Sequence, residues 1–283
     1  MASKFPTVLL ESTDGVRPAL HDMGGSGDPV LVCHATGFLG AVYAPMIQSL
    51  VEDFHVWTID MRGHGDSVTP AGISMSWWGH TQDVLAAVDY IGSPVLGFGH
   101  SMGGAAITAA CLKNSDAVRG AYLFEPIIFP AVGDAAAARR DSPIAEGARR
   151  RRATFESREA AFERYSSRPP LDGLDRQVLR LYVDEGFEDT EDGSVTLKCP
   201  PHIEAEVFMN SQIGIFEDLP TVEMPALVAS GRAEPGPPMY APGVAEELPH
   251  AQFHKDDALS HFGPFEDPAL VGGRVRDFLS SLR

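Results

Sequence analysis

The chain has 283 residues, 44% of them apolar, so it can bury a sizeable core in one large α/β domain or two small ones. Its formal net charge of −17 repels nucleic acids and anionic membranes, and we expect neither as a partner. The three cysteines are scattered and lack the spacing of a zinc site, so buried free thiols are expected at Cys33, Cys111 and Cys199.

The N-terminal sequence lacks the charged start, apolar core and cleavage site of a signal peptide. No apolar run is long enough to span a bilayer. We therefore expect a soluble, cytoplasmic protein.

Strand-like and helix-like runs alternate through most of the chain, which predicts an α/β fold with a mostly parallel central sheet and helices on both faces. The predicted strands are 8–10 and 16–21, which read as an opening hairpin, then 29–33, 55–60, 95–98, 120–124, 225–229 and 252–254. The predicted helices outside the middle of the chain are 43–50, 77–91, with apolar residues at helical spacing, and 267–282.

The run Gly99-His100-Ser101-Met102-Gly103-Gly104 stands between the apolar strand 95–98 and a stretch of small residues. Strand, tight turn and helix is the context of the G-x-S-x-G nucleophile elbow, whose strained turn lifts a serine hydroxyl out of the sheet. The small residues let strand and helix approach closely, and the free N–H groups of the helix N-terminus can stabilise a developing negative charge. We predict Ser101 as a nucleophile.

Residues 130–215 interrupt the alternation and are rich in Ala, Arg and Glu, with helix-favouring patches at 135–140, 144–165 and 176–184. The segment lies between two strands on the side where the elbow emerges. We predict a helical cap (lid) over the active site at 130–215, with 1–129 and 216–283 as the core. One interpretation of its four arginines, 149–152, is a binding site for an anionic substrate. A solvated helix face paired with Glu146, Glu156 and Glu159 is favoured.

A serine nucleophile needs a base, an orienting acid and an oxyanion hole, and in this topology the chain order is Ser, acid, His. His261 is the predicted base, because its Gly- and Pro-marked loop lies between the last strand and the last helix. Other histidines fit less well. His100 is expected to point into the sheet beside the nucleophile, and His64 lies in a turn after an earlier strand.

Two carboxylates follow strands on the correct edge of the sheet and compete for the role of the acid. Glu125 directly follows strand 120–124 in an apolar setting, where burying a lone charge costs on the order of several kcal/mol, so it needs a partner. Glu234 follows strand 225–229 in a loop that has a solvated composition. We favour Glu125 and keep Glu234 as the alternative.

The oxyanion hole is expected to use the N–H of Met102 and one N–H from the loop after strand 29–33. That loop reads His34-Ala35-Thr36-Gly37-Phe38. Thr36 or Phe38 is the predicted donor, and the sequence leaves the choice open.

Together these segments resemble the cap-bearing branch of the α/β-hydrolase superfamily. The segments are loop 34–38, Asp60-Met61-Arg62-Gly63-His64-Gly65-Asp66-Ser67, the elbow, Gly231-Arg232-Ala233-Glu234 and His261-Phe262-Gly263. The resemblance implies an α/β-hydrolase fold over nearly the whole chain outside the cap. Two positions depart from the family pattern: Ala35 stands where a glycine is usual, and Glu234 where an aspartate is usual. Haloalkane dehalogenases and zearalenone-opening lactonases place a glutamate after the strand that follows the elbow helix, and Glu125 is similar in position.

The predicted function is hydrolysis of a carboxylic ester or lactone through a seryl-acyl intermediate, with no metal or organic cofactor. Ser101 argues against haloalkane dehalogenase and epoxide hydrolase activity, because the enzymes of both groups use an aspartate nucleophile. Two alternatives stay open: a C–C bond hydrolase or cofactor-free peroxidase using the same triad, and a non-catalytic ligand receptor on this fold. The expected partner is a small-molecule ester or lactone, and a homodimer is left open.

Overall fold

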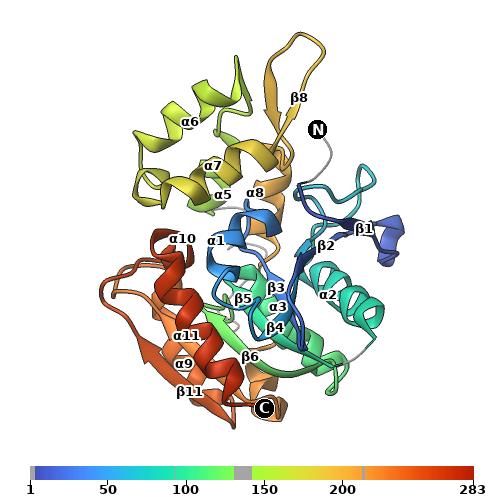
Figure 1. The fold of residues 1–283 in the computed structure, drawn as a ribbon, viewed down its shortest axis with the longest axis vertical. Helices are drawn as coiled ribbons and strands as arrows, with labels where there is room; N and C mark the ends of the chain where they lie inside the picture. The colour runs from blue at the N-terminus through green and yellow to red at the C-terminus, as the bar shows by residue number, and fades with distance from the viewer. Residues whose placement is uncertain (1–3, 93, 131–141, 212–213) are drawn as a thin grey trace.

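Residues 4–92, 94–130, 142–211 and 214–283 are described by the computed structural model of the chain, drawn in Figure 1. Eight strands form one sheet in the order β1-β2-β4-β3-β5-β6-β10-β11. β1 and β2 pair antiparallel, as do β2 and β4, and every later pair is parallel. The mostly parallel sheet is therefore confirmed. The strands are β1 (Thr7–Leu9), β2 (Ala19–Gly24), β3 (Asp28–Cys33), β4 (Phe54–Asp60), β5 (Val95–His100), β6 (Val118–Phe124), β10 (Ala226–Ser230) and β11 (Ala251–Lys255).

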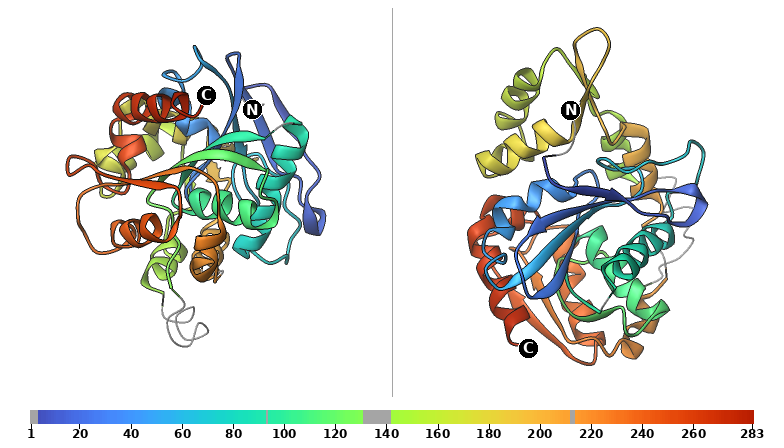
Figure 2. Two further views of the ribbon diagram at one scale, coloured as in Figure 1. Left: turned by 90° about the horizontal axis from the view of Figure 1, so that it is seen from below. Right: turned by 45° about the vertical axis from the view of Figure 1, so that its right-hand side comes forward.

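Helices cover both faces of this sheet, as Figure 2 shows. Successive side chains of a strand point to opposite faces. On β3, Val30 and Val32 join the apolar cluster that contains Val271 and Val275 of α11, whereas Leu31 joins the cluster that contains α2 and α3. The helices are α1 (Ala44–Ile47), α2 (Trp77–Ile91), α3 (Met102–Lys113), α9 (Ala241–Glu247), α10 (Gly263–Glu266) and α11 (Pro268–Ser280).

Two long helices show why the sequence pattern locates them well. Ser76 caps α2 by accepting a hydrogen bond from the Trp78 N–H, and the helix ends at Gly92 in the left-handed conformation. Asp267 caps α11 by accepting the Leu270 N–H over 3.0 Å, and Pro268 occupies the first helical position. The predicted ranges 77–91 and 267–282 agree with these helices to within two residues.

Two predicted elements at the start of the chain are shorter than expected. The opening hairpin is confirmed as β1 and β2, but β2 begins at Ala19, after a proline that has no N–H to donate to a neighbouring strand. The predicted helix 43–50 is a 3-10 turn, Gly40–Tyr43, that continues into the four-residue helix α1.

The segment between β6 and β10, described at residues 142–211, is called the inserted segment below. It forms α5 (Pro143–Arg149), β7 (Thr154–Phe155), α6 (Arg158–Ser166), α7 (Arg176–Glu185), β8 (Phe187–Asp189), β9 (Val195–Leu197) and α8 (Pro201–Met209). α6, α7 and the β8–β9 hairpin lie at the top of Figure 1, away from the C-terminal helix. The helix-favouring patch 144–165 is two helices and not one: α5 ends at Arg149, β7 intervenes, and α6 begins after Ser157, whose hydroxyl accepts the Ala160 N–H.

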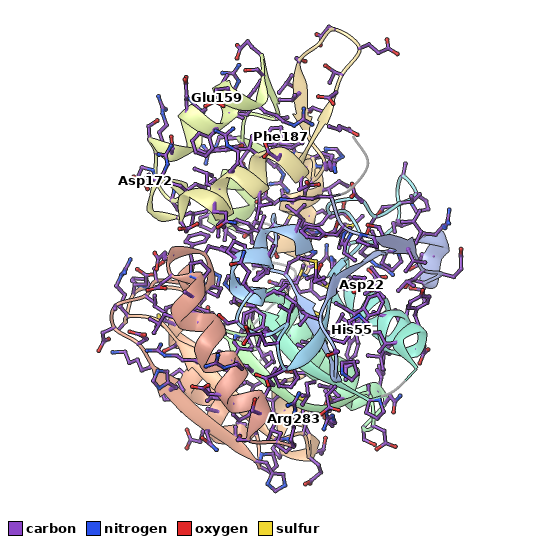
Figure 3. All side chains as sticks on the ribbon, viewed as in Figure 1. Asp22, His55, Glu159, Asp172, Phe187 and Arg283 are labelled. Carbon is purple, nitrogen blue, oxygen red and sulfur yellow. The ribbon has the colours of Figure 1, made fainter. Side chains whose placement is uncertain are left out.

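The strands of the inserted segment form a separate antiparallel sheet in the order β7-β9-β8, which the sequence pattern did not indicate. Phe187, labelled in Figure 3, begins β8 and packs against Phe155 of β7. The helix-favouring patch at 135–140 lies outside the described residues.

All three cysteines are buried and unpaired, as expected. Among the described residues, no helix combines the length and the apolar character needed to cross a lipid bilayer.

Candidate active site

Ser101 stands at the turn between β5 and α3 with φ 57° and ψ −115°, a strained conformation for a residue with a side chain. The turn is held by backbone hydrogen bonds to the exit of β6: the Ser101 N–H donates to Phe124 O over 3.0 Å, and the Ile127 N–H donates to Ser101 O over 3.3 Å. A Cβ at Gly103 would overlap the Cys33 carbonyl of β3, so only glycine allows this approach. The predicted strand–turn–helix context of Ser101 is present.

Glu125 follows β6 directly, is fully buried, and has φ 45°. Its Oε2 lies 2.6 Å from His261 Nδ1, and its Oε1 accepts the Gly231 N–H over 2.7 Å. A buried carboxylate with two donors is satisfied. In the neutral ring this hydrogen bond places the imidazole proton on Nδ1, so that Nε2 of His261 is the nitrogen that can accept a proton. The His261 side chain is 18% exposed.

Glu234 lies elsewhere. Its side chain is 38% exposed and forms an ion pair with Arg232, with 3.7 Å between Oε2 and the guanidinium Nε. The structure therefore brings Glu125, and not Glu234, to His261. The segment around Glu234 still contributes to the site, because the Gly231 N–H binds Glu125. Sequence reasoning missed this contact, since the pattern directs attention to the carboxylate rather than to the backbone before it.

The loop after β3 has most of its N–H groups engaged. The Ala35 N–H donates to Tyr43 Oη over 3.1 Å, the Gly37 N–H to His64 Nε2 over 3.1 Å, and the Phe38 N–H to Ala35 O over 3.1 Å. Of the two predicted oxyanion donors, Phe38 therefore already donates its N–H to the Ala35 carbonyl within the turn.

Thr36 is different, because its N–H has no acceptor within the described part of the chain. Its side chain also places it beside the elbow: Thr36 Oγ1 lies 3.4 Å from Sδ of Met102, the first residue of α3. Thr36 and Met102 are thus neighbours, and Met102 directly follows Ser101.

Four buried histidines surround this loop and the elbow. Burial, helped by neighbouring His64, lowers the pKa of His34 to about 3, and burial likewise lowers the pKa of His64. The pKa values of His80 and His100 lie well below the usual range, again chiefly through burial. All four rings are therefore neutral and serve as hydrogen-bond acceptors or donors to fixed partners, a role that the sequence did not reveal.

Asp60 and Arg62 of the Asp-x-Arg-Gly motif are structural anchors. Asp60 is fully buried and accepts the Gly40 N–H at 2.7 Å, the Asp66 N–H at 2.8 Å and His21 Nε2 at 3.0 Å. His21, Asp60 and Asp66 stand close enough together to hold a metal ion. His21 and Asp60 already bind each other, and Asp66 pairs with Lys198, so these contacts account for the cluster without a metal ion.

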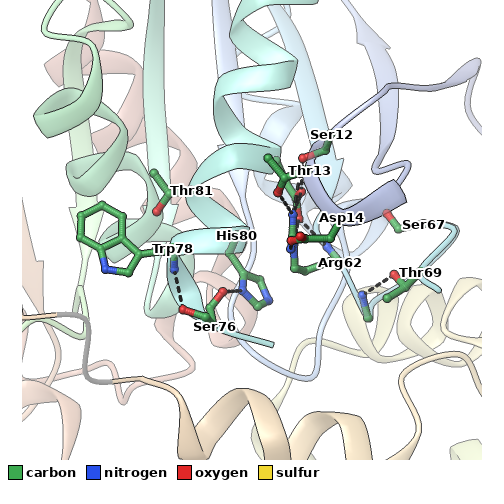
Figure 4. A network of polar contacts seen from close by, with 12 residues as sticks. Ser12, Thr13, Asp14, Arg62, Ser67, Thr69, Ser76, Trp78, His80 and Thr81 are labelled. Carbon is green, nitrogen blue, oxygen red and sulfur yellow. Dashed lines mark hydrogen bonds and ion pairs between the residues drawn. The ribbon is translucent and has the colours of Figure 1, made fainter. Parts of the chain in front are cut away.

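Arg62 is fully buried and ties three segments together, as Figure 4 shows. Its guanidinium binds Asp83 of α2 through Nε at 3.0 Å and Nη2 at 2.8 Å, and reaches Thr13 at 3.0 Å and Asp14 at 3.1 Å. The fork-shaped pairing with Asp83 fits the planar geometry of arginine.

The arginine run 149–152 is a solvated face only in part. Arg149 pairs with Glu146, and Arg152 pairs with Glu156 at 2.8 Å, as predicted. Glu159, however, pairs with Arg180 at 3.0 Å and not with the run.

Arg151 is the second departure from the predicted solvated face. It binds Glu204 of α8, which is 6% exposed, and Tyr182 Oη at 2.6 Å. A Cβ at Gly37 would lie 2.5 Å from Glu204 Oε1, so this pair packs against the loop after β3.

The family model described as "Alpha/beta hydrolase family" matches residues 30–272. Haloalkane dehalogenase 2 of Mycobacterium tuberculosis is 29% identical over 120 residues, which cover 42% of this chain and 42% of that protein. The (E)-2-((N-methylformamido)methylene)succinate hydrolase of Acinetobacter baylyi is 30% identical over 108 residues, 36% of this chain and 39% of that protein. The chain thus spans about two-fifths of the length of these curated relatives.

The solved structure of a thermophilic esterase from Thermogutta terrifontis, with malate bound, superposes with a TM-score of 0.73. The two chains are 23% identical, and the match covers 99% of each. At this identity the likeness concerns the fold.

Proposed function

Because the chain belongs to the alpha/beta hydrolase family, we propose that it is a serine hydrolase that cleaves a carboxylic ester or lactone through a seryl-acyl intermediate. The observation that carries the proposal is the 2.6 Å hydrogen bond from His261 Nδ1 to the buried Glu125, in a chain whose elbow presents Ser101. In this proposal Ser101 is the nucleophile, His261 the base and Glu125 the orienting acid.

The first half of the reaction forms the acyl-enzyme. Ser101 Oγ attacks the carbonyl carbon while His261 Nε2 takes the hydroxyl proton, and Glu125 stabilises the resulting imidazolium. The carbonyl oxygen becomes an oxyanion. When the intermediate collapses, the bond to the leaving oxygen breaks and His261 returns the proton to that oxygen.

The second half repeats this chemistry with water. His261 removes a proton from a water molecule, which attacks the acyl carbon, and Ser101 leaves with the proton that His261 holds. The products are a carboxylic acid and an alcohol. For a lactone they are one hydroxy acid.

We propose Thr36, with Met102, as the oxyanion donors. Donors aimed at a developing oxyanion must not be engaged elsewhere in the ground state. The Phe38 N–H is engaged with Ala35 O, whereas the described residues offer no acceptor to the Thr36 N–H. Thr36 and Met102 are also in contact through their side chains.

A serine nucleophile also separates this proposal from the activity named for the mycobacterial relative. Displacement of a halide gives an alkyl-enzyme ester when a carboxylate attacks, and water can hydrolyse that ester. Attack by Ser101 would give an ether, which the same triad has no means to cleave. The C–C hydrolase and peroxidase alternatives use the same triad and are separated only by substrate.

A chain-length panel of nitrophenyl esters and lactones tests the proposal, with wild type and Ser101→Ala side by side. We expect hydrolysis by the wild type, a burst of nitrophenol from the better esters, and neither from the variant. Wild-type protein that hydrolyses no member of the panel, yet releases acid from a C–C cleavage substrate, would replace the ester proposal with that alternative.

A further inference from the structure

Tyr43 and His100 are both fully buried and connect the loop after β3 to the loop that carries His261. The Ala35 N–H donates to Tyr43 Oη over 3.1 Å, and Tyr43 Oη lies 2.9 Å from His100 Nδ1. His100 Nε2 in turn lies 2.8 Å from the backbone oxygen of His261. Three hydrogen bonds therefore link two loops that are far apart in the sequence.

Only one arrangement of protons satisfies all three bonds. The His261 carbonyl can only accept, so the single proton of neutral His100 sits on Nε2. His100 Nδ1 is then an acceptor, and the Tyr43 hydroxyl donates to it while its oxygen accepts the Ala35 N–H. Burial, with His261 nearby, lowers the pKa of His100 well below its usual range, which keeps the ring neutral.

We propose that Tyr43 and His100 are positioning residues that fix the distance between the oxyanion loop and the base, through a continuous hydrogen-bonded link from Ala35 to the backbone of His261. The inference rests on the proposed function, which makes Thr36 of one loop an oxyanion donor and His261 of the other loop the base. The His100 and His261 rings have centroids 5.0 Å apart, but the hydrogen bond of His100 is to the His261 backbone and not to its imidazole. Displacing catalytic groups by about 1 Å is enough to cost on the order of a hundredfold in rate.

The competing explanation is that the two side chains only satisfy each other in an apolar core. Tyr43 does pack in one, against Phe98 with ring centroids 5.8 Å apart and Phe265 at 4.8 Å. In that case, breaking the link should lower stability and leave the turnover of the folded protein unchanged. Turnover and stability therefore have to be measured separately.

The test compares Tyr43→Phe with Tyr122→Phe. Tyr122 is an equally buried tyrosine, and its ring stacks on Phe98 at 6.1 Å. Both substitutions remove the hydroxyl of a buried tyrosine whose ring contacts Phe98, but only Tyr43 belongs to the link. With both hydrogen bonds of the Tyr43 hydroxyl lost, we expect kcat of Tyr43→Phe to fall by about tenfold to a hundredfold with KM within about threefold. Tyr122→Phe should keep kcat within about twofold of wild type.

His100 variants separate the two halves of the link. His100→Gln can still place an N–H near the His261 carbonyl, whereas His100→Asn reaches only toward Tyr43. We expect Gln to recover part of the activity that Asn loses. Tyr43→Phe combined with His100→Asn should cost little more than His100→Asn alone, because both break one link. Losses that multiply, or equal kcat in Tyr43→Phe and Tyr122→Phe, would overturn the inference.

Proton NMR gives a reading that does not depend on turnover. The His261 Nδ1 proton, in its 2.6 Å bond to Glu125, should resonate far downfield in wild type and in Tyr122→Phe. In Tyr43→Phe it should shift or broaden, because His100, which holds the His261 carbonyl, loses its own hydrogen bond to Tyr43. An unchanged resonance in Tyr43→Phe would count against the link even if no substrate were found, whereas an ester-inactive wild type would count against the proposed function alone.

Discussion

The polar side chains around the elbow and the charged side chains of the inserted segment are arranged on opposite principles. Around the elbow, buried groups such as Asp60, His64 and Glu125 bind backbone N–H groups of loops from other parts of the chain. In the inserted segment several charged side chains pair with each other near the surface, as Glu159, labelled in Figure 3, does with Arg180.

The difference lies in what each interaction holds. A buried acceptor bound to a loop N–H fixes the loop and cannot be removed without leaving a polar group unsatisfied. An exposed ion pair fixes little and is screened by solvent and salt. Conservative substitutions should therefore have large effects around the elbow and small ones in the inserted segment, with the Arg151–Glu204 pair as the exception.

The largest effect is expected from Ser101→Ala. Loss of a triad nucleophile typically lowers kcat on the order of a million-fold. The fold should remain intact, because the Ser101 contacts described above are made by its backbone. Ester hydrolysis and thermal unfolding are measured together, and a folded variant that keeps a tenth of wild-type activity would remove Ser101 from the mechanism.

Next comes the pair Glu125→Gln and Glu234→Gln. Loss of the orienting acid costs roughly ten-thousand-fold in kcat when geometry is kept, so Glu125→Gln should fall by that order. Glu234→Gln should change kcat little, since its carboxylate is partly exposed and pairs with Arg232. The comparison is made on protein shown to be folded by circular dichroism, and the reverse pattern would exchange the two assignments.

A large effect on stability is expected at the buried Arg62–Asp83 ion pair. Arg62→Met leaves the Asp83 carboxylate buried without its partner and should lower the free energy of unfolding by about 3–5 kcal/mol. Urea unfolding measures it. The matched control, Arg180→Met, removes a partly exposed guanidinium from the inserted segment and should change the urea midpoint far less. Equal shifts in the two variants would erase the contrast between the regions.

The buried neutral histidines predict a pH dependence of stability. Their pKa values are lower in the folded chain than the ordinary value of about 6.5, so unfolding takes up protons and stability falls as the pH falls below that value. Each such ring lowers the free energy of unfolding by up to about 1.4 kcal/mol for each pH unit below about 6.5. For His34 this loss continues down to its folded pKa of about 3. His21 opposes this trend, because Asp60 outweighs the effect of burial and raises its pKa.

Urea unfolding at a series of pH values between 7 and about 5 tests this prediction. The pKa values of His34, His64, His80 and His100 are lowered by burial in the folded chain, so the unfolding free energy should decline over that interval. A flat profile would show that these rings are not held neutral.

The smallest effect is expected from Arg152→Met in the arginine run. Its partner Glu156 is exposed, so activity and stability should both stay near wild type. Arg151→Met, one residue earlier, leaves Glu204 buried beside Gly37 and should lower both. The two variants, compared in the same thermal unfolding and ester assays, show whether Arg151 differs in its effect from an exposed arginine of the same run.

The parts of this molecule that the sequence predicts are those encoded locally. The elbow, α2 and α11 each have their periodicity, cap and glycine or proline signals within a few neighbouring residues. Glu125 could be favoured because an apolar neighbourhood makes an unpaired carboxylate costly.

The contacts that escaped prediction join distant segments. The Gly231 N–H on Glu125, the His64 ring on the Gly37 N–H and the Asp83 carboxylate on Arg62 have no local signature. Helix-favouring residues likewise run through 150–157, but pairing with β9 makes Thr154–Phe155 a strand. At all of these positions, contacts between distant segments determine the structure, and no short stretch of sequence indicates them.

The most direct test of the central claim, that the Glu125–His261 pair activates Ser101, is the rate of labelling by a fluorophosphonate, with the labelled residue located by peptide mass spectrometry. We predict a single adduct on Ser101, formed at nearly equal rates in wild type and Glu234→Gln and far more slowly in Glu125→Gln. An adduct on another residue, or equal labelling rates in the two glutamine variants, would contradict the account.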